Sequence, residues 1–214
     1  MLSPNPPKFL EFLENMARNE NPPFGRGETW FNGVGATTTD PTAVVGKEWL
    51  FEDTNPVTKV VRSNKSVWCR AVRNVSGISL LPRRLVTYKN AVNSWGLEVD
   101  GYTTTTAAGP AHPVDEFLPS TGVANNDVFW IVIRGPAECI TDLAQVDDIS
   151  VGSRVVALTA ATSQATTAGR LDLADFNAST TTQSNQILNY IGFALSAVTS
   201  GNTNNAFLVE VGHW

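Results

Sequence analysis

The sequence predicts a mainly β fold, either a sandwich or a small barrel, preceded by an extended N-terminal arm that carries a short helix. Charged residues make up only 16% of the 214 residues, while Thr, Ser, Asn, Ala and Val are abundant, which favours strands over solvated helices. Turn signals recur about every 8–12 residues, the spacing typical of an all-β domain. We find neither a βαβ alternation nor a repeat of fixed period.

The first predicted unit, residues 1–46, is the arm. "PPKFLEFLENMARNE" places Phe9, Leu10, Phe12, Leu13 and Met16 at helical spacing. Prolines suit the start of this helix, and "NENPP" ends it. A helix this short is unstable alone in water, so its apolar face must lie on the body of the protein or on a partner. The Pro- and Gly-rich stretch that follows favours a partner.

The second predicted unit, residues 47–120, is β-rich with a long connecting loop. "KEWLFEDT" and "KSVWCRAVRNVSG" alternate as strands do, with Val67, Cys69 and Ala71 on one face and Trp68 and Val72 on the other. Further strands are expected in "ISLLPRRLVTYKN" and "WGLEVDGY". "AHPVDEFLPSTGVANN" is predicted to be a long irregular connection because it is rich in Pro and polar turn residues.

The third predicted unit, residues 121–214, is a C-terminal β-domain. Val128 to Ile133 are apolar without interruption, which indicates a strand buried on both faces in the middle of a sheet or barrel. Strands are expected in "RVVALTA" and "GRLDL", and two more in "NYIGFALSAVTSGNTNNAFLVEV". Gly192 and Ala194 are expected to let the backbone come close to a neighbouring strand.

The charge pattern argues against nucleic acid and membrane partners. The formal net charge is −5, and "LLPRRL" is the densest basic spot, so phosphate binding lacks its main driving force. No apolar run approaches the ~20 residues of a membrane-spanning helix. "MLSPNPPKF" lacks the basic and apolar regions of a signal peptide, so we expect assembly in a cytoplasm.

Residues capable of catalysis or metal binding are few, so we predict no enzyme, no metal and no cofactor. Two His and two Cys residues do not stand at zinc-ligand spacing. No Gly-x-Ser-x-Gly elbow is present, and "GVGATTTD" precedes no helix that could bind phosphate. The carboxylate pairs Glu52–Asp53 and Asp147–Asp148 are interpreted as solvated turns. Two weaker hypotheses remain. One is a calcium-binding loop formed by Asp172, Asp175 and Asn177. The other is an active site in "AHPVDEF" formed by His112, Asp115 and Glu116.

Cysteine and tryptophan residues give further expectations. Cys69 and Cys139 are expected to be buried and free, although a disulfide between them is an alternative. Trp68 and Trp130 are expected in the core. Three other tryptophans are near turns or ends, where a large amphipathic ring often marks a contact surface or a sugar site, namely Trp30, Trp95 and Trp214.

Residues 123–211 resemble the small β-domains of the decoration, or cement, proteins of tailed-phage capsids. The resemblance is carried by "DVFWIVIRGPAECITD", "ISVGSRVVALTAATSQATTAGRL" and "IGFALSAVTSGNTNNAFLVEVG" in this order. The small and apolar residues that match the family pattern are Trp130, Gly135 and Ala137, then Val151, Gly152 and Val155, then Gly192, Ala194, Leu195, Ala197 and Val198.

The resemblance implies a non-enzymatic protein, expected to be a homotrimer, that binds the major capsid protein on the outer surface of the virion. It would hold neighbouring capsid subunits together against the pressure of packed DNA. The arm would then reach a neighbouring subunit, with Phe9, Phe12, Leu13 and Met16 as anchors and Trp30 and Phe31 near its root. The alternative is a carbohydrate- or receptor-binding β-module of a phage fibre or surface adhesin, with Trp95 and Trp214 in a binding groove.

Overall fold

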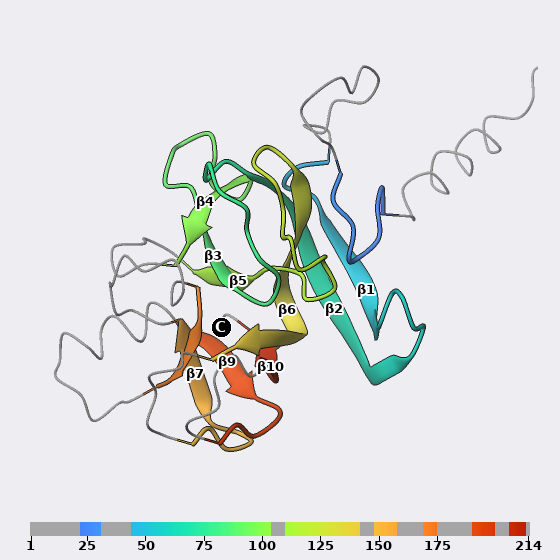
Figure 1. Cartoon of the computed structure of the whole chain (residues 1–214), viewed down its shortest axis with the longest axis vertical. Helices are drawn as coiled ribbons and strands as arrows, with labels where there is room; N and C mark the ends of the chain where they lie inside the picture. The colour runs from blue at the N-terminus through green and yellow to red at the C-terminus, as the bar shows by residue number, and fades with distance from the viewer. Residues whose placement is uncertain are drawn as a thin grey trace, which may run out of the picture.

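The computed structural model describes residues 22–30, 44–103, 110–141, 148–157, 169–174, 190–199 and 206–212 (Figure 1). These residues form strands and no helix, so the predicted mainly β fold is confirmed. Within this part of the chain, no helix is long or apolar enough to cross a membrane. The strands are β1 (Glu48–Thr54), β2 (Val61–Asn74), β3 (Leu85–Tyr88), β4 (Glu98–Tyr102), β5 (Ala111–Pro113), β6 (Val128–Ile140), β7 (Arg154–Ala157), β8 (Leu171–Leu173), β9 (Tyr190–Ala194) and β10 (Ala206–Val211).

The strands form one path in the order β5-β3-β4-β2-β6-β10-β9-β7-β8, and β1 pairs with β2 beside it. Both ends of the path return to β6. Val114, just after β5, forms a bridge with Ile131, and Leu171 of β8 forms one with Thr141, just after β6. The sheet is therefore two nearly closed, barrel-like halves that share β6, seen in the upper and lower parts of Figure 1.

β6 serves both halves because it changes partner at Gly135. Its first part pairs with β2 as far as Arg134, and its second part pairs with β10 from Gly135 onward. Gly135 has a φ of 101°, and a Cβ there would lie 2.5 Å from the carbonyl oxygen of Ser66. Only glycine meets both conditions without strain.

The core confirms the predicted central strand. Val128 to Val132 are buried on both faces of β6, in the middle of the strand order. Trp130 contacts three rings, with centroid distances of 4.6 Å to Phe24, 5.4 Å to Trp49 and 5.2 Å to Phe51. Phe129 and Ile131 belong to a second buried cluster, with Val86 and Val99 among its members. Val67, Cys69 and Ala71 share the cluster of Trp130, as their alternation predicted.

Two predictions about the strands and the core are wrong. Trp68 is not in the core: its side of β2 faces outward, and the residue is 40% exposed. The connection after residue 110 is not irregular at its start, because Ala111–Pro113 form β5 and the chain stays buried through Glu116. The strand was not predicted because it is only three residues long and is surrounded by turn residues. The predicted helix lies outside the described residues, and the division into three units stays a prediction.

Gly192 is predicted to be intolerant of any side chain. A Cβ at this position would lie 1.8 Å from the carbonyl oxygen of Glu210 in β10, so Gly192→Ala forces the β9–β10 pair apart. We expect a loss of about 3 kcal/mol or more in the free energy of unfolding, measured by urea denaturation. Gly25→Ala is the matched control, because Gly25 has no positive φ and its added Cβ would meet only the side chain of Glu28, at an ordinary contact distance of 3.5 Å. Equal losses in both variants would contradict the close approach.

The two cysteines provide a chemical test of the core. Both are free and fully buried, as expected, and burial raises the pKa of each thiol above its ordinary value. Because the thiolate is the reactive form, dithiobis-nitrobenzoate at pH 8 should leave the native protein unmodified and titrate two thiols in denaturant. Reaction of either thiol at the rate of a free cysteine, without denaturant, would refute this burial.

Candidate protein-binding surface

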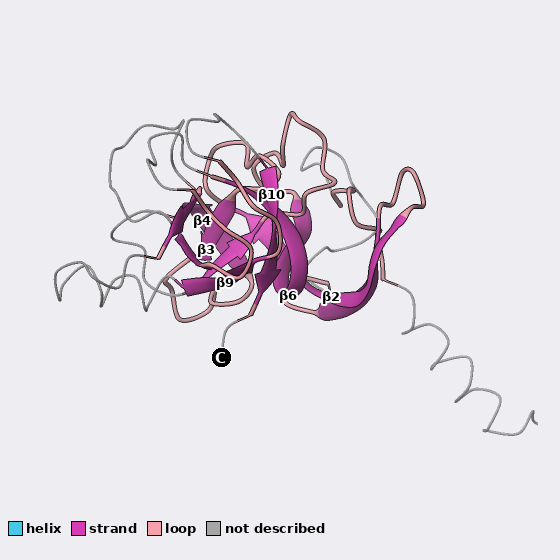
Figure 2. Ribbon diagram, turned by 90° about the horizontal axis from the view of Figure 1, so that it is seen from below, coloured by secondary structure: helices cyan, strands magenta, loops and turns pink. Residues whose placement is uncertain are grey.

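The β1–β2 hairpin extends beyond the body of the protein (Figure 2). Its turn is held by Asn55, whose side-chain oxygen accepts hydrogen bonds from the backbone N–H groups of Val57 at 2.9 Å and Thr58 at 3.0 Å. Lys59 completes the turn with a φ of 61°. Such a side-chain-to-backbone turn fixes the conformation of the end of the hairpin locally.

The two faces of the hairpin differ in what they contact. Trp49 and Phe51 point inward to Trp130. Leu50, between them, points outward opposite Trp68 of β2 and is 51% exposed. The alternation of side chains along a strand therefore places apolar residues on both faces, of which only one is covered by the core.

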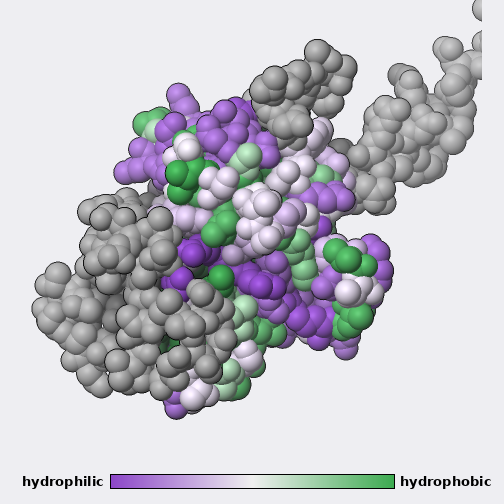
Figure 3. Space-filling model, viewed as in Figure 1, coloured by the Kyte–Doolittle hydropathy of each residue, from purple (hydrophilic) through white to green (hydrophobic). Residues whose placement is uncertain are grey.

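Exposed apolar residues concentrate on this hairpin. It carries five of the ten most exposed large apolar residues in the described part of the chain, with Val57 at its end 82% exposed. Figure 3 shows apolar spheres gathered there, with hydrophilic residues around them. Isolated apolar residues on a surface are ordinary, but a cluster marks a contact site. The five residues on the hairpin form two groups, Leu50 with Trp68 and the three valines beside the turn, with the exposed pair of Glu52 and Ser66 between them. We call the two groups together the hairpin surface, and its residues are Leu50, Val57, Val60, Val61 and Trp68.

An aromatic group adjoins the hairpin on the side of β4. Arg70, on the outward face of β2 like Trp68, binds Glu48 and donates a hydrogen bond of 2.9 Å to the hydroxyl of Tyr88. The ring of Tyr88 lies 5.6 Å from that of Trp95, which is 47% exposed. Exposed tryptophan beside arginine is the composition of energetically important interface residues.

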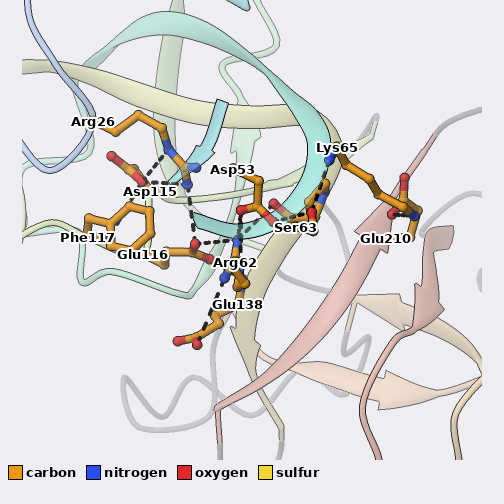
Figure 4. A network of polar contacts seen from close by, with 11 residues as sticks. Arg26, Asp53, Arg62, Ser63, Lys65, Asp115, Glu116, Phe117, Glu138 and Glu210 are labelled. Atoms are coloured by element: carbon orange, nitrogen blue, oxygen red, sulfur yellow. Dashed lines mark hydrogen bonds and ion pairs between the residues drawn. The ribbon is translucent and has the colours of Figure 1, made fainter. Parts of the chain in front are cut away.

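A network of buried charges joins the turn end of the hairpin to the body of the protein (Figure 4). Arg62 donates two hydrogen bonds to Asp53, of 2.9 and 2.6 Å, and lies 2.8 Å from Glu116. Ser63 donates a third bond to Asp53, at 2.6 Å. The backbone N–H of Glu138 in β6 donates to the other oxygen of Glu116. β1, β2, β6 and the segment after β5 are thereby joined at one place.

The same network holds the segment 22–30. Arg26 donates two hydrogen bonds to one oxygen of Asp115, of 3.1 and 3.0 Å, and Gly27 donates its backbone N–H to the other at 2.6 Å. The guanidinium lies over the ring of Phe117, 4.7 Å from its centroid. The side chains of Arg26 and Asp115 are 3% and 0% exposed, so each needs the other as a counter-charge.

Burial and charge oppose each other in this network. Burial, the largest single effect, lowers the pKa of Arg26, but the opposing effects of its neighbours, Asp115 first among them and Glu116 included, together outweigh it, and the pKa lies above its ordinary value. Burial also raises the pKa of Glu116, against the opposing effects of Arg26 and Arg62. The arginines therefore remain charged, and the carboxylates serve as their counter-ions.

The three residues of the hypothesised active site in "AHPVDEF" are all buried. Asp115 and Glu116 are buried and bound to arginines, while the ring of His112 is buried 5.0 Å from that of Tyr88. The interpretation of Asp53 as a solvated residue is wrong, because it is fully buried with Arg62 as its partner. No group of His, Cys, Asp and Glu among the described residues could hold a metal ion. Asp147, Asp175 and Asn177 lie outside those residues.

The structure describes one of the six predicted partner-contact residues. Trp30 is half-buried, with its ring edge-on to Phe24 at 6.0 Å and its backbone bridged to Val128. Its role in binding a partner stays a prediction. The remaining residues lie outside the described part, as does Trp214, and they are Phe9, Phe12, Leu13, Met16 and Phe31.

No family model and no curated protein matches this sequence. A solved structure, the N base of the head fibre protein gp8.5 of bacteriophage phi29, aligns with 67% of this chain and 92% of its own length. The sequence identity is 12% and the TM-score 0.38. A similarity of this size carries no argument about the function of the chain.

Removal of Asp115 should destabilise the whole fold. Asp115→Ala leaves the buried guanidinium of Arg26 without its main counter-charge, for which we expect a loss of about 3–5 kcal/mol in the free energy of unfolding. Lys65→Ala removes an exposed ion pair to Glu210 and should cost less than about 1 kcal/mol. Urea denaturation compares the two variants, and similar losses would show that the buried network is not needed for stability.

Proposed function

We propose that this protein is a structural component of a phage virion. It binds the outer surface of the capsid as a homo-oligomer, expected to be a trimer, and holds neighbouring major capsid subunits together. The hairpin surface carries this proposal, because a cluster of exposed apolar residues on a firmly anchored hairpin suits a protein partner better than a small ligand. The arm, with Phe9, Phe12, Leu13 and Met16, is proposed to contact a neighbouring subunit.

The positions that carry the resemblance to decoration proteins have structural roles in this fold. Gly135 lets β6 pass close to Ser66, and Gly192 lets β9 approach Glu210. Trp130 is the centre of the core. These roles support a shared β-domain, and the virion setting comes from the resemblance alone.

Binding of this kind stabilises a capsid by linkage. A protein that binds only the assembled shell lowers the free energy of that state relative to the disassembled one. Several copies joined in one oligomer bind more tightly than one copy, since the later contacts form within one complex. The proposal needs no catalysis, and the described acidic residues of "AHPVDEF" are engaged with arginines.

The alternative, a carbohydrate- or receptor-binding module, has less support. A pocket of about 150 Å³ lies among β6, β9 and β10, and Phe193 is its one aromatic lining residue. Trp95, the described tryptophan suspected of sugar binding, does not line that pocket. A glycan screen with clear, saturable binding would favour this alternative.

Head binding tests the proposal. Purified protein should co-sediment with heads that lack it, assembled from the major capsid protein of the same source, and should delay their disruption by heat. Leu50→Ser/Trp68→Ser removes two apolar contacts from the hairpin surface and should weaken binding at least about tenfold. Val92→Ser is the control, because Val92 is 99% exposed but lies on another turn. Absence of binding by the wild-type protein would refute the proposed function.

A further inference from the structure

The pocket among β6, β9 and β10 contains a positive charge that no described residue balances. Arg134 of β6 lines the pocket and is exposed, and within the described part of the chain no hydrogen bond or ion pair engages its guanidinium. Glu210 of β10 also lines the pocket, but its carboxylate is paired with Lys65 at 2.6 Å (Figure 4). The net charge of the pocket is therefore positive and located on Arg134.

A bulge in β6 brings Arg134 to this position. Arg134 pairs with Trp68 of β2, and Val132 pairs with the next residue of that strand. Ile133 lies between them without a residue opposite it, which is the pattern of a β-bulge. A bulge bends its strand and redirects the side chains around it. Ile133 and Arg134 both line the pocket, just before β6 changes partner at Gly135.

The pocket has the size of a single side chain. Its volume of about 150 Å³ is below the ~300–1,000 Å³ of typical small-molecule sites. Phe193 and Ile133 supply apolar lining, and Gly192 and Gly212 add no side chain that would fill the space. A group with a short aliphatic stem and a charged end therefore suits this pocket.

A carboxylate is the charged end that the pocket suits best. An arginine binds a carboxylate through two parallel hydrogen bonds in one plane, whereas a cation would be repelled by Arg134. A phosphate group carries about two negative charges, so Glu210 in the same pocket would repel it more strongly than it repels a carboxylate. The side chain of aspartate or glutamate has both the stem and the single negative charge.

Exposed apolar residues beside the pocket favour a protein as the source of this side chain. Leu50 is opposite Trp68, and Trp68 is opposite Arg134, so the three form a row across β1, β2 and β6. Leu50 is 51% and Trp68 40% exposed on the outward face. The row spans two strand spacings, about 10 Å, which is beyond the reach of a small ligand held in the pocket. Tryptophan and arginine are typical of the residues that dominate protein interfaces.

We infer that the pocket binds an acidic side chain, of aspartate or glutamate, from the protein partner. Arg134 is the counter-ion of that side chain, and Leu50 and Trp68 contact the residues around it. Lys65 is a positioning residue, because it holds the carboxylate of Glu210, which would otherwise compete for Arg134. This deepens the proposed function, on which it rests, by naming the chemistry of the capsid residue that is bound.

Titration with a small probe tests the pocket in solution, without capsids. The probe is N-acetylglutamate α-methylamide, and its uncharged analogue N-acetylglutamine α-methylamide is the matched control. In NMR spectra, the side-chain Nε–H signal of Arg134 should shift and saturate with the glutamate probe, with at least about tenfold weaker binding of the glutamine probe. Arg134→Gln should abolish the binding. Lys65→Ala should weaken it, and Lys65→Ala/Glu210→Gln should restore it, because no free carboxylate then competes for Arg134.

Head binding tests the same residue in the complex. Arg134→Glu reverses the charge of the pocket and should weaken binding of the protein to heads at least about tenfold. Lys47→Glu is the matched control, because it makes the same change of charge at an exposed residue that does not line the pocket. Its binding should stay within about threefold of the wild type. Both variants should keep their buried cysteines unreactive, which shows that they are folded.

Three results would overturn the inference. The first is the absence of a saturable shift with the glutamate probe, or equal affinity for the two probes. The second is tighter binding of inorganic phosphate or N-acetylneuraminic acid than of the glutamate probe, which would assign the pocket to another class of ligand. The third is head binding that Arg134→Glu leaves unchanged. A wild-type protein that binds the glutamate probe but no heads would instead refute the proposed function, so the two proposals fail separately.

Discussion

The change of partner in β6 at Gly135 is the constraint on which the described structure depends. The strand pairs with β2 before this residue and with β10 after it, and both barrel-like halves close on it through bridges at Ile131 and Thr141. Its side chains fill two buried clusters, because Trp130 points to one and Phe129 to the other. Disruption of β6 would open both halves at once.

The buried charges hold two parts of the chain that lie outside the barrel-like halves, the segment 22–30 and the β1–β2 hairpin. Asp115 holds the segment 22–30 through Arg26, and Glu116 holds the hairpin through Arg62, which also pairs with Asp53 inside the hairpin. Glu116 contacts both arginines and the backbone of β6. A buried charge without its partner is strongly unfavourable, so these pairs disfavour arrangements that separate the segments they join. The candidate interface therefore lies on a hairpin that is held to the rest of the protein by these ion pairs.

The site was less predictable than the fold. The alternation of β2 correctly assigned Val67, Cys69 and Ala71 to a buried face, yet Trp68 was expected in the core and is exposed. In β1, Leu50 is flanked by Trp49 and Phe51, and nothing in the order of three apolar residues shows which one lacks a cover. Exposure depends on what packs against each face, and here that partner, Trp130, comes from residues far along the chain.

The sequence alone determined the strand content, the central position of Val128–Val132 and the glycine at residue 192, because side-chain periodicity and steric size act locally. Only the tertiary structure decided that Asp53, Asp115 and Glu116 are buried and paired with arginines. Their partners, Arg26 and Arg62, are up to 90 residues away in the sequence. The sequence does not show whether water or a buried guanidinium balances the charge of a carboxylate, because only folding brings the guanidinium close to it.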